Sequence, residues 1–375
     1  PNALLPHTKK LLFLEDGQMV VLNSKLSLFH LGGGADTTPG ELEPNFTKVD
    51  WEYSSAKLNK EPYFMLKEIH EQPAVLRTIS KNLEGIEKVA GLIKKAFGTY
   101  LIGCGTASYA CLAGVYLFSN FAKKHVNFTL GSEFKYLEDF ITKKTLIIPI
   151  SQSGESVDVT EPVTRAKMKG ARIASIINVL GSTLYRESDF NVLLHAGVEK
   201  AVVATKSFIA MIAVIILTAY ALIGKKSEGK EMIADAAKNV TEILEERYIV
   251  KVKKVVNFLK DKEHVYIIGR GLSYAIALEA ALKLKEVTYI HAEGFAGGEL
   301  KHGTIALIEK GTPVISLVCN HDPAMLSNVK EVEARGAKAI IIGTEAGDIV
   351  VPTDHDGTFG ILAAVVGQFL AYYLA

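Results

Sequence analysis

The chain has 375 residues, of which 49% are hydrophobic and 22% charged, a composition typical of folded globular proteins and not of disordered ones. Its 42 Lys and Arg residues nearly balance 41 Asp and Glu residues, so net charge gives no support to a nucleic-acid-binding or membrane-surface protein. The length exceeds that of one compact core and predicts two or three domains.

The three cysteines carry no sign of a metal site or a disulfide framework. Cys104, Cys111 and Cys319 lack the short paired spacings of such sites. The first two lie in apolar sequence, where free thiols pack as small hydrophobic groups. Few cysteines without disulfide spacing are typical of proteins in a reducing compartment, so we expect a cytoplasmic protein.

In chain order, residues 11–22 (LLFLEDGQMVVL) hold two apolar runs on either side of Glu15-Asp16-Gly17. Asp-Gly between apolar runs predicts a β-hairpin. Because a lone hairpin is only marginally stable, we expect this one to complete the sheet of a preceding domain. Residues 31–45 are rich in Gly, Pro and polar residues and predict a linker.

The pattern then becomes helical. Residues 64–83 (FMLKEIHEQPAVLRTISKNL) have apolar positions at helical spacing, with Pro73 near the middle. Proline removes a helical hydrogen bond and clashes with the preceding turn. We therefore expect two helical stretches that meet at Pro73.

An internal duplication organises residues 84–375. YLIGCG at 100–105 returns as YIIGRG at 266–271, and an apolar run opens at Gly170 and again at Gly336, each time 166 residues later. Further strands are expected in corresponding places, at 145–150 and 312–318 and at 192–194 and 349–351. Strands alternating with helices predict an α/β fold of two lobes, each a parallel sheet covered by helices on both faces.

Each half closes with a long apolar helix, residues 207–224 in the first half and 360–375 in the second. The first segment has 18 residues without a charge, the length of a marginal membrane span. Because such a helix recurs at the same place in both halves, we favour a buried core helix and expect no membrane insertion.

The strand at 145–150 ends in a polar loop, Ser151-Gln152-Ser153-Gly154-Glu155-Ser156. Hydroxyls, an amide and a glycine between a strand and a helix suit a phosphate, because glycine lets the backbone approach and the helix dipole favours an anion. An ordinary serine-rich turn with an N-cap is the alternative. The second half has Cys319-Asn320-His321-Asp322 here, with an acid that repels phosphate, so only the first lobe is expected to bind one.

A second cluster of chemical groups follows YIIGRG. Glu279, Lys283 and Glu286 are spaced to share one helix face, and His291, Glu293, Glu299, Lys301 and His302 follow in glycine-rich sequence. A carboxylate near an amine and an imidazole can transfer protons at neutral pH. A solvated, ion-paired helix face is the alternative for Glu279 with Lys283.

Other chemistries find less support. His291, Glu293 and His302 do not match zinc-site spacings, so no metal is expected. The chain has no G-x-S-x-G turn for a nucleophilic serine. The two G-x-G turns lack the third glycine of a dinucleotide site, and no cofactor is expected.

Taken together, the motifs resemble one family, the isomerase portion of glucosamine-6-phosphate synthase, also called glutamine–fructose-6-phosphate aminotransferase. The resemblance rests on eight segments: KEIHEQP (67–73), CGT (104–106), SQSGES (151–156), RESD (186–189), ATKSF (204–208), ALKLKE (281–286), YIHAE (289–293) and GELKHG (298–303). It implies two flavodoxin-like sugar-isomerase lobes in a cytosolic homodimer. It also implies conversion of fructose 6-phosphate and glutamine to glucosamine 6-phosphate and glutamate.

The same resemblance assigns roles by position. Glu286 is implied as the base that moves a proton between C1 and C2 of the sugar, with Lys283 stabilising the enediolate-like charge. His302 is implied as the ring-opening histidine, which reaches across from the second subunit. The implied contacts with the hexose 6-phosphate are those of Thr106, Ser108, Ser151, Gln152, Ser153, Ser156, Val202, Glu279 and Glu293.

The chain departs from the family pattern in several places. Ala107, Ala204 and Thr304 stand where the family commonly has serine, serine and proline. The family's C-terminal tail with its Schiff-base lysine and the glutaminase cysteine nucleophile are absent from the sequence. We therefore expect an isomerase fragment of a longer synthase, which lacks glutaminase activity and has impaired isomerisation.

The expected domains are a glutaminase-domain remnant with its linker (1–48), linker helices (49–83), a first lobe with the phosphate loop (84–228) and a second lobe with the catalytic cluster (229–375). Two other functions remain open. A stand-alone sugar-phosphate isomerase or deaminase would have no use for the N-terminal hairpin. A non-catalytic sugar-phosphate sensor would not need Glu286, Lys283 and His302.

Overall fold

A computed structural model describes residues 4, 7–15, 17–32, 39–49, 58, 60–82 and 84–375. The chain divides into two compact units, Pro1–Asn59 and Lys60–Ala375.

The first unit contains two small antiparallel sheets. One pairs β1 (Lys10–Leu11) with β5 (Thr47–Lys48), and the other has β2 (Gln18–Leu22), β3 (Leu26–His30) and β4 (Gly40–Leu42) in that order. β4 lies within the predicted linker 31–45, of which residues 33–38 fall outside the described part of the chain.

The hairpin predicted over residues 11–22 is wrong in its pairing. Among the described residues, β2 pairs with β3 around a turn at Asn23–Lys25, where the Lys25 N–H donates to Asn23 Oδ1 at 2.9 Å. Asp16, in the predicted turn, lies outside the described residues. A local turn signal marks where the chain reverses, and the strand that becomes the neighbour is decided by contacts further along the chain.

The second unit begins with α1 (Phe64–Lys81) and α2 (Ile86–Lys95). The predicted break at Pro73 is wrong, because Pro73 lies inside one continuous helix. A proline there costs about 3 kcal/mol. Ile69, Leu76 and Ile79 on the same helix are fully buried, and each such side chain stabilises the fold by about 2 kcal/mol. Burial therefore outweighs the missing hydrogen bond.

The first lobe is built on five parallel strands in the order β10-β9-β8-β6-β7. The strands are β6 (Gly98–Gly103), β7 (Asn127–Leu130), β8 (Thr145–Ser151), β9 (Arg172–Ile177) and β10 (Phe190–Leu193). The connections contain α3 (Thr106–Ala122), the short helices η2 (Gly131–Tyr136) and η3 (Glu138–Phe140), α4 (Val157–Met168) and α5 (Thr183–Glu187).

The second lobe repeats this topology, with parallel strands in the order β15-β14-β13-β11-β12. The strands are β11 (His264–Gly269), β12 (His291–Ala296), β13 (Pro313–Val318), β14 (Lys338–Gly343) and β15 (Ile349–Val350). The helices are α8 (Glu246–Leu259), α9 (Leu272–Thr288), η4 (Thr304–Leu307), α10 (Pro323–Ala334) and α11 (Asp356–Leu374). Both sheets have the 2-1-3-4-5 order of flavodoxin-like folds, which confirms the predicted duplication and fold class.

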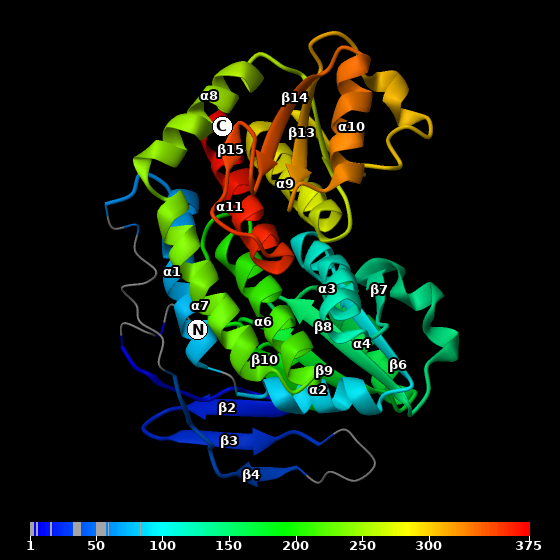
Figure 1. The fold of residues 1–375 in the computed structure, drawn as a ribbon. Helices are drawn as coiled ribbons and strands as arrows, with labels where there is room; N and C mark the ends of the chain where they lie inside the picture. The colour runs from blue at the N-terminus through cyan, green and yellow to red at the C-terminus, as the bar shows by residue number, and fades with distance from the viewer. Residues whose placement is uncertain are drawn as a thin grey trace. The chain divides into compact units, whose positions relative to one another are not determined.

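The two lobes meet through their helices (Figure 1). α3 packs against α9, and α6 (Lys206–Leu222) and α11 pack against each other; α7 (Lys226–Ile243) contacts α1, α6 and α11. One hydrophobic cluster runs through both lobes and includes Phe208 of α6 and Phe369 of α11. The carboxyl ends of β6 and β8 are thereby brought toward the helix that carries Glu279, Lys283 and Glu286.

The long apolar helices are core helices, as predicted. α11 has the length and composition of a membrane span, but 83% of its apolar window is buried inside the protein. α6 is shorter, and every residue from Lys206 to Ala219 is buried. The apolar character of these helices after their first residue reflects packing between the lobes.

Candidate active site

The phosphate loop follows β8, all seven residues of which are buried. The Gly154 N–H donates to Ser151 Oγ at 2.9 Å, and the Glu155 N–H donates to Ser153 Oγ at 3.3 Å. The loop leads into α4, whose N-cap residue, Ser156, makes no capping hydrogen bond with its side chain. The structure therefore has the strand–loop–helix arrangement that the sequence predicted for the anion site.

Gly154 is required by the shape of this loop. Its φ of +69° lies in the left-handed region, and a Cβ atom there would stand 2.2 Å from Ser182 Oγ and 2.4 Å from Ile177 Cδ1. Glu155 fixes the other side of the loop, because its carboxylate accepts hydrogen bonds from the backbone and hydroxyl of Thr183, at 3.0 and 2.7 Å. This anchoring role of Glu155 is not visible in the sequence.

The three charged residues predicted to share a helix face, Glu279, Lys283 and Glu286, lie together on α9. Lys283 Nζ is 2.6 Å from Glu286 Oε2 and 3.4 Å from Glu279 Oε1. Lys283 and Glu279 are each 1% exposed, whereas Glu286 is 34% exposed. The cluster thus places a buried ammonium between an enclosed carboxylate and one that a ligand can reach.

Thr106 connects this cluster to the first lobe. Its Oγ1 accepts a hydrogen bond from Lys283 Nζ at 3.0 Å and donates to Glu279 Oε1 at 3.3 Å. Thr106 is the first residue of α3, just after β6, and β6 is the direct neighbour of β8. The carboxyl ends of adjacent parallel strands share one sheet edge, so the phosphate loop and the Thr106 contact lie on the same side of the first lobe.

Burial dominates the electrostatics of Glu279. It raises the pKa of this carboxyl from its ordinary value of 4.5 to about 7, although the Lys283 ammonium and the Thr106 hydrogen bond act in the opposite direction. A protonated Glu279 leaves the Lys283 charge to pair with Glu286. Glu286 is then the carboxylate of the cluster available to accept a proton from a ligand.

The other predicted site residues are placed as follows. The Ser108 hydroxyl is buried and donates to the Gly105 carbonyl at 2.6 Å, so it serves the local turn. Val202 is fully exposed in the loop before α6, and Gln152 is half-buried in the phosphate loop. His302 is exposed in a turn after β12, where its backbone N–H donates to the Glu299 carbonyl.

Glu293 lies on the far side of its sheet from the cluster. It is on β12 between Ala292, which belongs to the core shared with α9, and Gly294, whose added Cβ would lie 2.8 Å from Leu278 Cα of α9. Side chains alternate along a strand, so Glu293 points to the opposite face. Within residues 60–82 and 84–375, no hydrogen bond or ion pair joins Glu293 or His302 to the cluster.

A second buried polar network holds the segment 199–206, which we call the α6 entry segment. Glu68 Oε1 accepts hydrogen bonds from the backbone N–H groups of Lys200 (2.5 Å) and Ala201 (3.1 Å). Lys206 Nζ is 2.7 Å from Glu71 Oε2. Residues of the KEIHEQP motif on α1 therefore hold the segment that leads into the ATKSF motif. The sequence did not reveal this pairing because the two motifs are far apart in the chain.

Metal chemistry finds no support in the described parts of the chain, where no three His, Cys, Asp or Glu side chains converge as ligands. The carboxylates, the ammonium and the hydroxyl joined by these contacts are groups that suit acid–base chemistry.

A family model described as the SIS domain matches residues 92–221 and again residues 258–364. Glutamine–fructose-6-phosphate aminotransferase [isomerizing] of Clostridium acetobutylicum is 36% identical over 399 residues, which cover 100% of this chain and 65% of that protein. The protein of the same name from Geobacillus kaustophilus is 38% identical over 393 residues, covering 100% and 64%. The chain thus spans less than two thirds of the length of these relatives.

Solved structures agree. The C-terminal domain of glucosamine-fructose-6-phosphate aminotransferase from Francisella tularensis has a TM-score of 0.77 and 31% identity, covering 85% of this chain and 97% of that one. Glucosamine-6-phosphate deaminase from Thermotoga maritima has a TM-score of 0.69 and 25% identity, covering 84% and 94%. The chain belongs to the SIS-domain family, and within it to the isomerase domains of the glutamine–fructose-6-phosphate aminotransferases.

Proposed function

We propose that this chain is the isomerase part of an enzyme that converts fructose 6-phosphate and ammonia to glucosamine 6-phosphate, the ammonia coming from glutamine in a longer protein. The observation that carries the proposal is the hydrogen-bonded chain from Thr106 through Lys283 to Glu286, which joins the phosphate-binding lobe to the proton-transferring helix. The names of the relatives support the reaction.

The sugar phosphate binds at the loop 151–156, with Thr106 beside it. Glu286 moves the proton between C1 and C2, because it is the partly exposed carboxylate of the cluster. Lys283 stabilises the negative charge that develops on the sugar oxygens, and its burial strengthens that interaction. Glu279 and Val202 are proposed as further residues near the sugar, and Glu293 is left out because it points to the opposite face of its sheet.

His302 opens the sugar ring in this proposal, reaching the site of a second subunit. Its exposure and the absence of a contact with the cluster among the described residues support a role in trans. A homodimer follows from this proposal. We also propose a cytoplasmic location, a glutaminase domain as the partner that supplies ammonia, residues 1–48 as the remnant of that domain, and catalysis without a cofactor.

Ligand binding tests the phosphate loop. Fructose 6-phosphate at saturating concentration is expected to raise the melting temperature by about 3 °C or more, since a ligand selective for the folded state stabilises it. Fructose serves as the control and should give little shift because it lacks the phosphate. Equal shifts with both sugars would contradict the assignment of the loop.

Substitution tests the base. In the full-length enzyme, Glu286→Gln should lower the isomerisation rate by a factor of about 100 or more while fructose 6-phosphate still binds. Glu309→Gln, at an exposed carboxylate outside the cluster, is the matched control. Retained activity in the Glu286→Gln variant would exclude Glu286 as the base.

The quaternary state tests the role of His302. Sedimentation should show a dimer, and mixing Glu286→Gln with His302→Ala subunits should restore part of the activity, since one hybrid site then holds both native residues. A strictly monomeric active enzyme would contradict catalysis in trans.

A glucosamine-6-phosphate deaminase is the second candidate, favoured by the similarity to the Thermotoga maritima structure. It would release ammonia from glucosamine 6-phosphate without any glutaminase. Ammonia release by this chain alone, faster than sugar amination, would favour the deaminase.

A further inference from the structure

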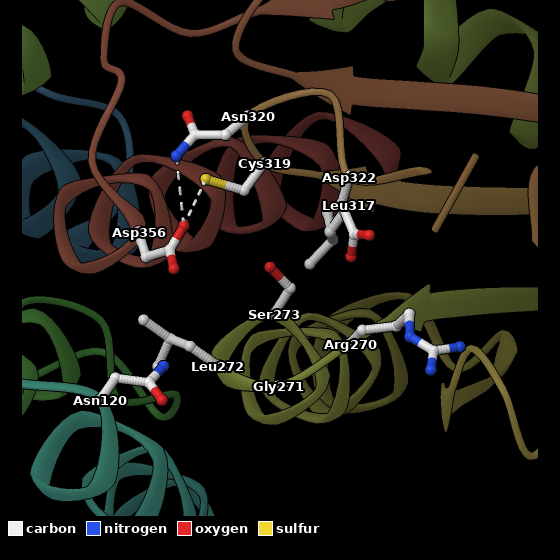
Figure 2. Close-up of a pocket in the computed structure, with 10 residues that line it drawn as sticks. All are labelled: Asn120, Arg270, Gly271, Leu272, Ser273, Leu317, Cys319, Asn320, Asp322 and Asp356. Carbon is white, nitrogen blue, oxygen red and sulfur yellow. Dashed lines mark hydrogen bonds between the residues drawn. The ribbon is translucent and has the colours of Figure 1, made fainter. Parts of the chain in front are cut away.

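A cavity of about 350 Å³ lies in the second lobe, at the carboxyl ends of β11 and β13 (Figure 2). Its walls come from the turn Arg270–Ser273, the loop after β13 with Cys319, Asn320 and Asp322, and the first residue of α11, Asp356. One wall residue, Asn120, belongs to α3 of the first lobe. The volume is that of a site for a monosaccharide-sized molecule.

This cavity occupies the place that corresponds, through the internal duplication, to the candidate active site. Both loops follow the third strand of their lobe, β8 and β13, and both end at the N-cap residue of the next helix, Ser156 in the first lobe and Asp322 in the second. The helices α3 and α9 also correspond, because both their first and their last residues are 166 positions apart. By this separation Asn120 of α3 is the counterpart of Glu286 of α9. The active site combines the first lobe's loop with α9, and the cavity combines the second lobe's loop with α3.

The cavity differs from its counterpart in charge. Asp322 and Asp356 contribute two carboxylates. The one cationic wall residue, Arg270, directs its guanidinium away from the centre in Figure 2, with Nη1 donating to Asn328 Oδ1 at 3.1 Å. Two carboxylates repel a phosphate and favour a cation. No three His, Cys, Asp or Glu side chains converge as metal ligands within the described residues, so the cation would be organic.

Ser273 is the second sign of a ligand. The residue is 7% exposed, its hydroxyl points into the cavity in Figure 2, and the hydroxyl makes no hydrogen bond to another part of residues 60–82 and 84–375. Because this hydroxyl opens into the cavity, it is available to bind a ligand hydroxyl. The amides of Asn120 and Asn320 offer further partners for hydroxyl groups, and Leu272 and Leu317 provide apolar surface for a sugar ring.

We propose that this cavity is a second ligand site, which binds a hexosamine through its ammonium group. Asp356 holds the ammonium, Ser273 and Asn120 bind ring hydroxyls, and Asp322, whose Oδ1 accepts from the Ala324 N–H at 2.9 Å, adds negative charge to the wall. Asp356 has one oxygen engaged by the Cys319 thiol at 3.0 Å and the other oxygen available. The site needs no phosphate on the sugar, which separates it from the loop 151–156.

Titration of the protein with glucosamine and with glucose, followed by calorimetry or saturation-transfer NMR, tests the proposal. Glucosamine should bind at millimolar concentration, and glucose should bind at least about tenfold more weakly because it lacks the charged group. Equal binding of the two sugars, or no binding of glucosamine, would overturn the proposal.

Variants locate the site. Asp356→Asn should weaken glucosamine binding about tenfold, and the small substitution Ser273→Ala should weaken it several-fold while leaving the fold intact. Asp354→Asn, at an exposed neighbour outside the wall, is the control and should bind as the unchanged protein does. If Glu286→Gln instead removes glucosamine binding, the sugar binds at the first site and the proposal is wrong. Fructose 6-phosphate binding is measured separately, so this failure is distinct from failure of the proposed function.

Discussion

Glu279 shows how one enclosed side chain sets the chemistry of its neighbours. Its Oε1 receives the Thr106 hydrogen bond, while Oε2 has no hydrogen-bond partner in the described residues of the second unit. The cost of burying this charge raises the pKa of Glu279 to about 7. Near neutral pH the group therefore changes between a neutral acid and a second partner for Lys283.

The raised pKa of Glu279 predicts a pH-dependent stability. Between about pH 4.5 and 7 the folded state holds a proton that the unfolded state has released, so the free energy of unfolding falls as pH rises, by about 3 kcal/mol across this window. Glu279→Gln should remove that fall. Urea unfolding at several pH values measures it, and an unchanged pH dependence in the variant would contradict the assignment.

The conformation and close packing of Gly154 predict that its substitution lowers the stability of the protein. Gly154→Ala should destabilise the protein by about 3 kcal/mol or more, because left-handed strain adds to overlap with Ser182 and Ile177. Gly311→Ala is a matched control, since its φ is +83° but nothing lies within 4 Å of the added Cβ, so strain of about 1–2 kcal/mol remains. Chemical denaturation compares them, and equal losses would show that space around Gly154 has no effect.

At the scale of elements, α1 acts as a support for the α6 entry segment. Glu68 and Glu71 lie within two turns before Pro73 and reach backbone and side-chain donors of residues 200–206. Glu199 also caps α6, accepting hydrogen bonds from the Thr205 and Ser207 N–H groups at 2.9 and 3.1 Å. The segment that presents Val202 is therefore held at several points.

Lys206→Met tests this support. Lys206 is 2% exposed and its partner Glu71 is 29% exposed, so loss of the pair should destabilise the protein by about 2 kcal/mol. The control is Lys226→Met, because Lys226 begins α7 as Lys206 begins α6 and pairs with Glu87, which is 69% exposed. That surface pair should contribute less than about 1 kcal/mol. Similar losses for both variants would argue against a supporting role.

At the scale of the molecule, the duplicated lobes share one core. The largest hydrophobic cluster includes residues of both sheets and of α3, α6, α9 and α11. Neither lobe can bury these helix faces alone, so residues 60–375 should unfold in a single transition. Urea unfolding monitored by circular dichroism and by tyrosine fluorescence should give coincident curves, and two separated transitions would contradict the shared core.

The sequence alone determined the local and repeated features. Apolar strands, the closing helices and the duplication are short-range or periodic patterns, and strands appear where they predict them, whereas the edge strands β7 and β12 were not predicted. The spacing of Glu279, Lys283 and Glu286 likewise placed all three on one helix, since a helix brings i, i+4 and i+7 together. The position of the loop 151–156 between a strand and a helix was also predicted, because its residues are consecutive in the chain.

Only the tertiary structure showed the features that depend on contacts between residues far apart in the chain. The pairing of β2 with β3, the continuity of α1 through Pro73, and the support of the α6 entry segment by Glu68 all rest on contacts that sequence order does not reveal. The same is true of the Thr106 contact with Lys283, which joins residues 177 positions apart. Such contacts depend on the free energy of packing the whole core. A short stretch of sequence does not reveal that free energy, because it comes from residues that are distant along the chain.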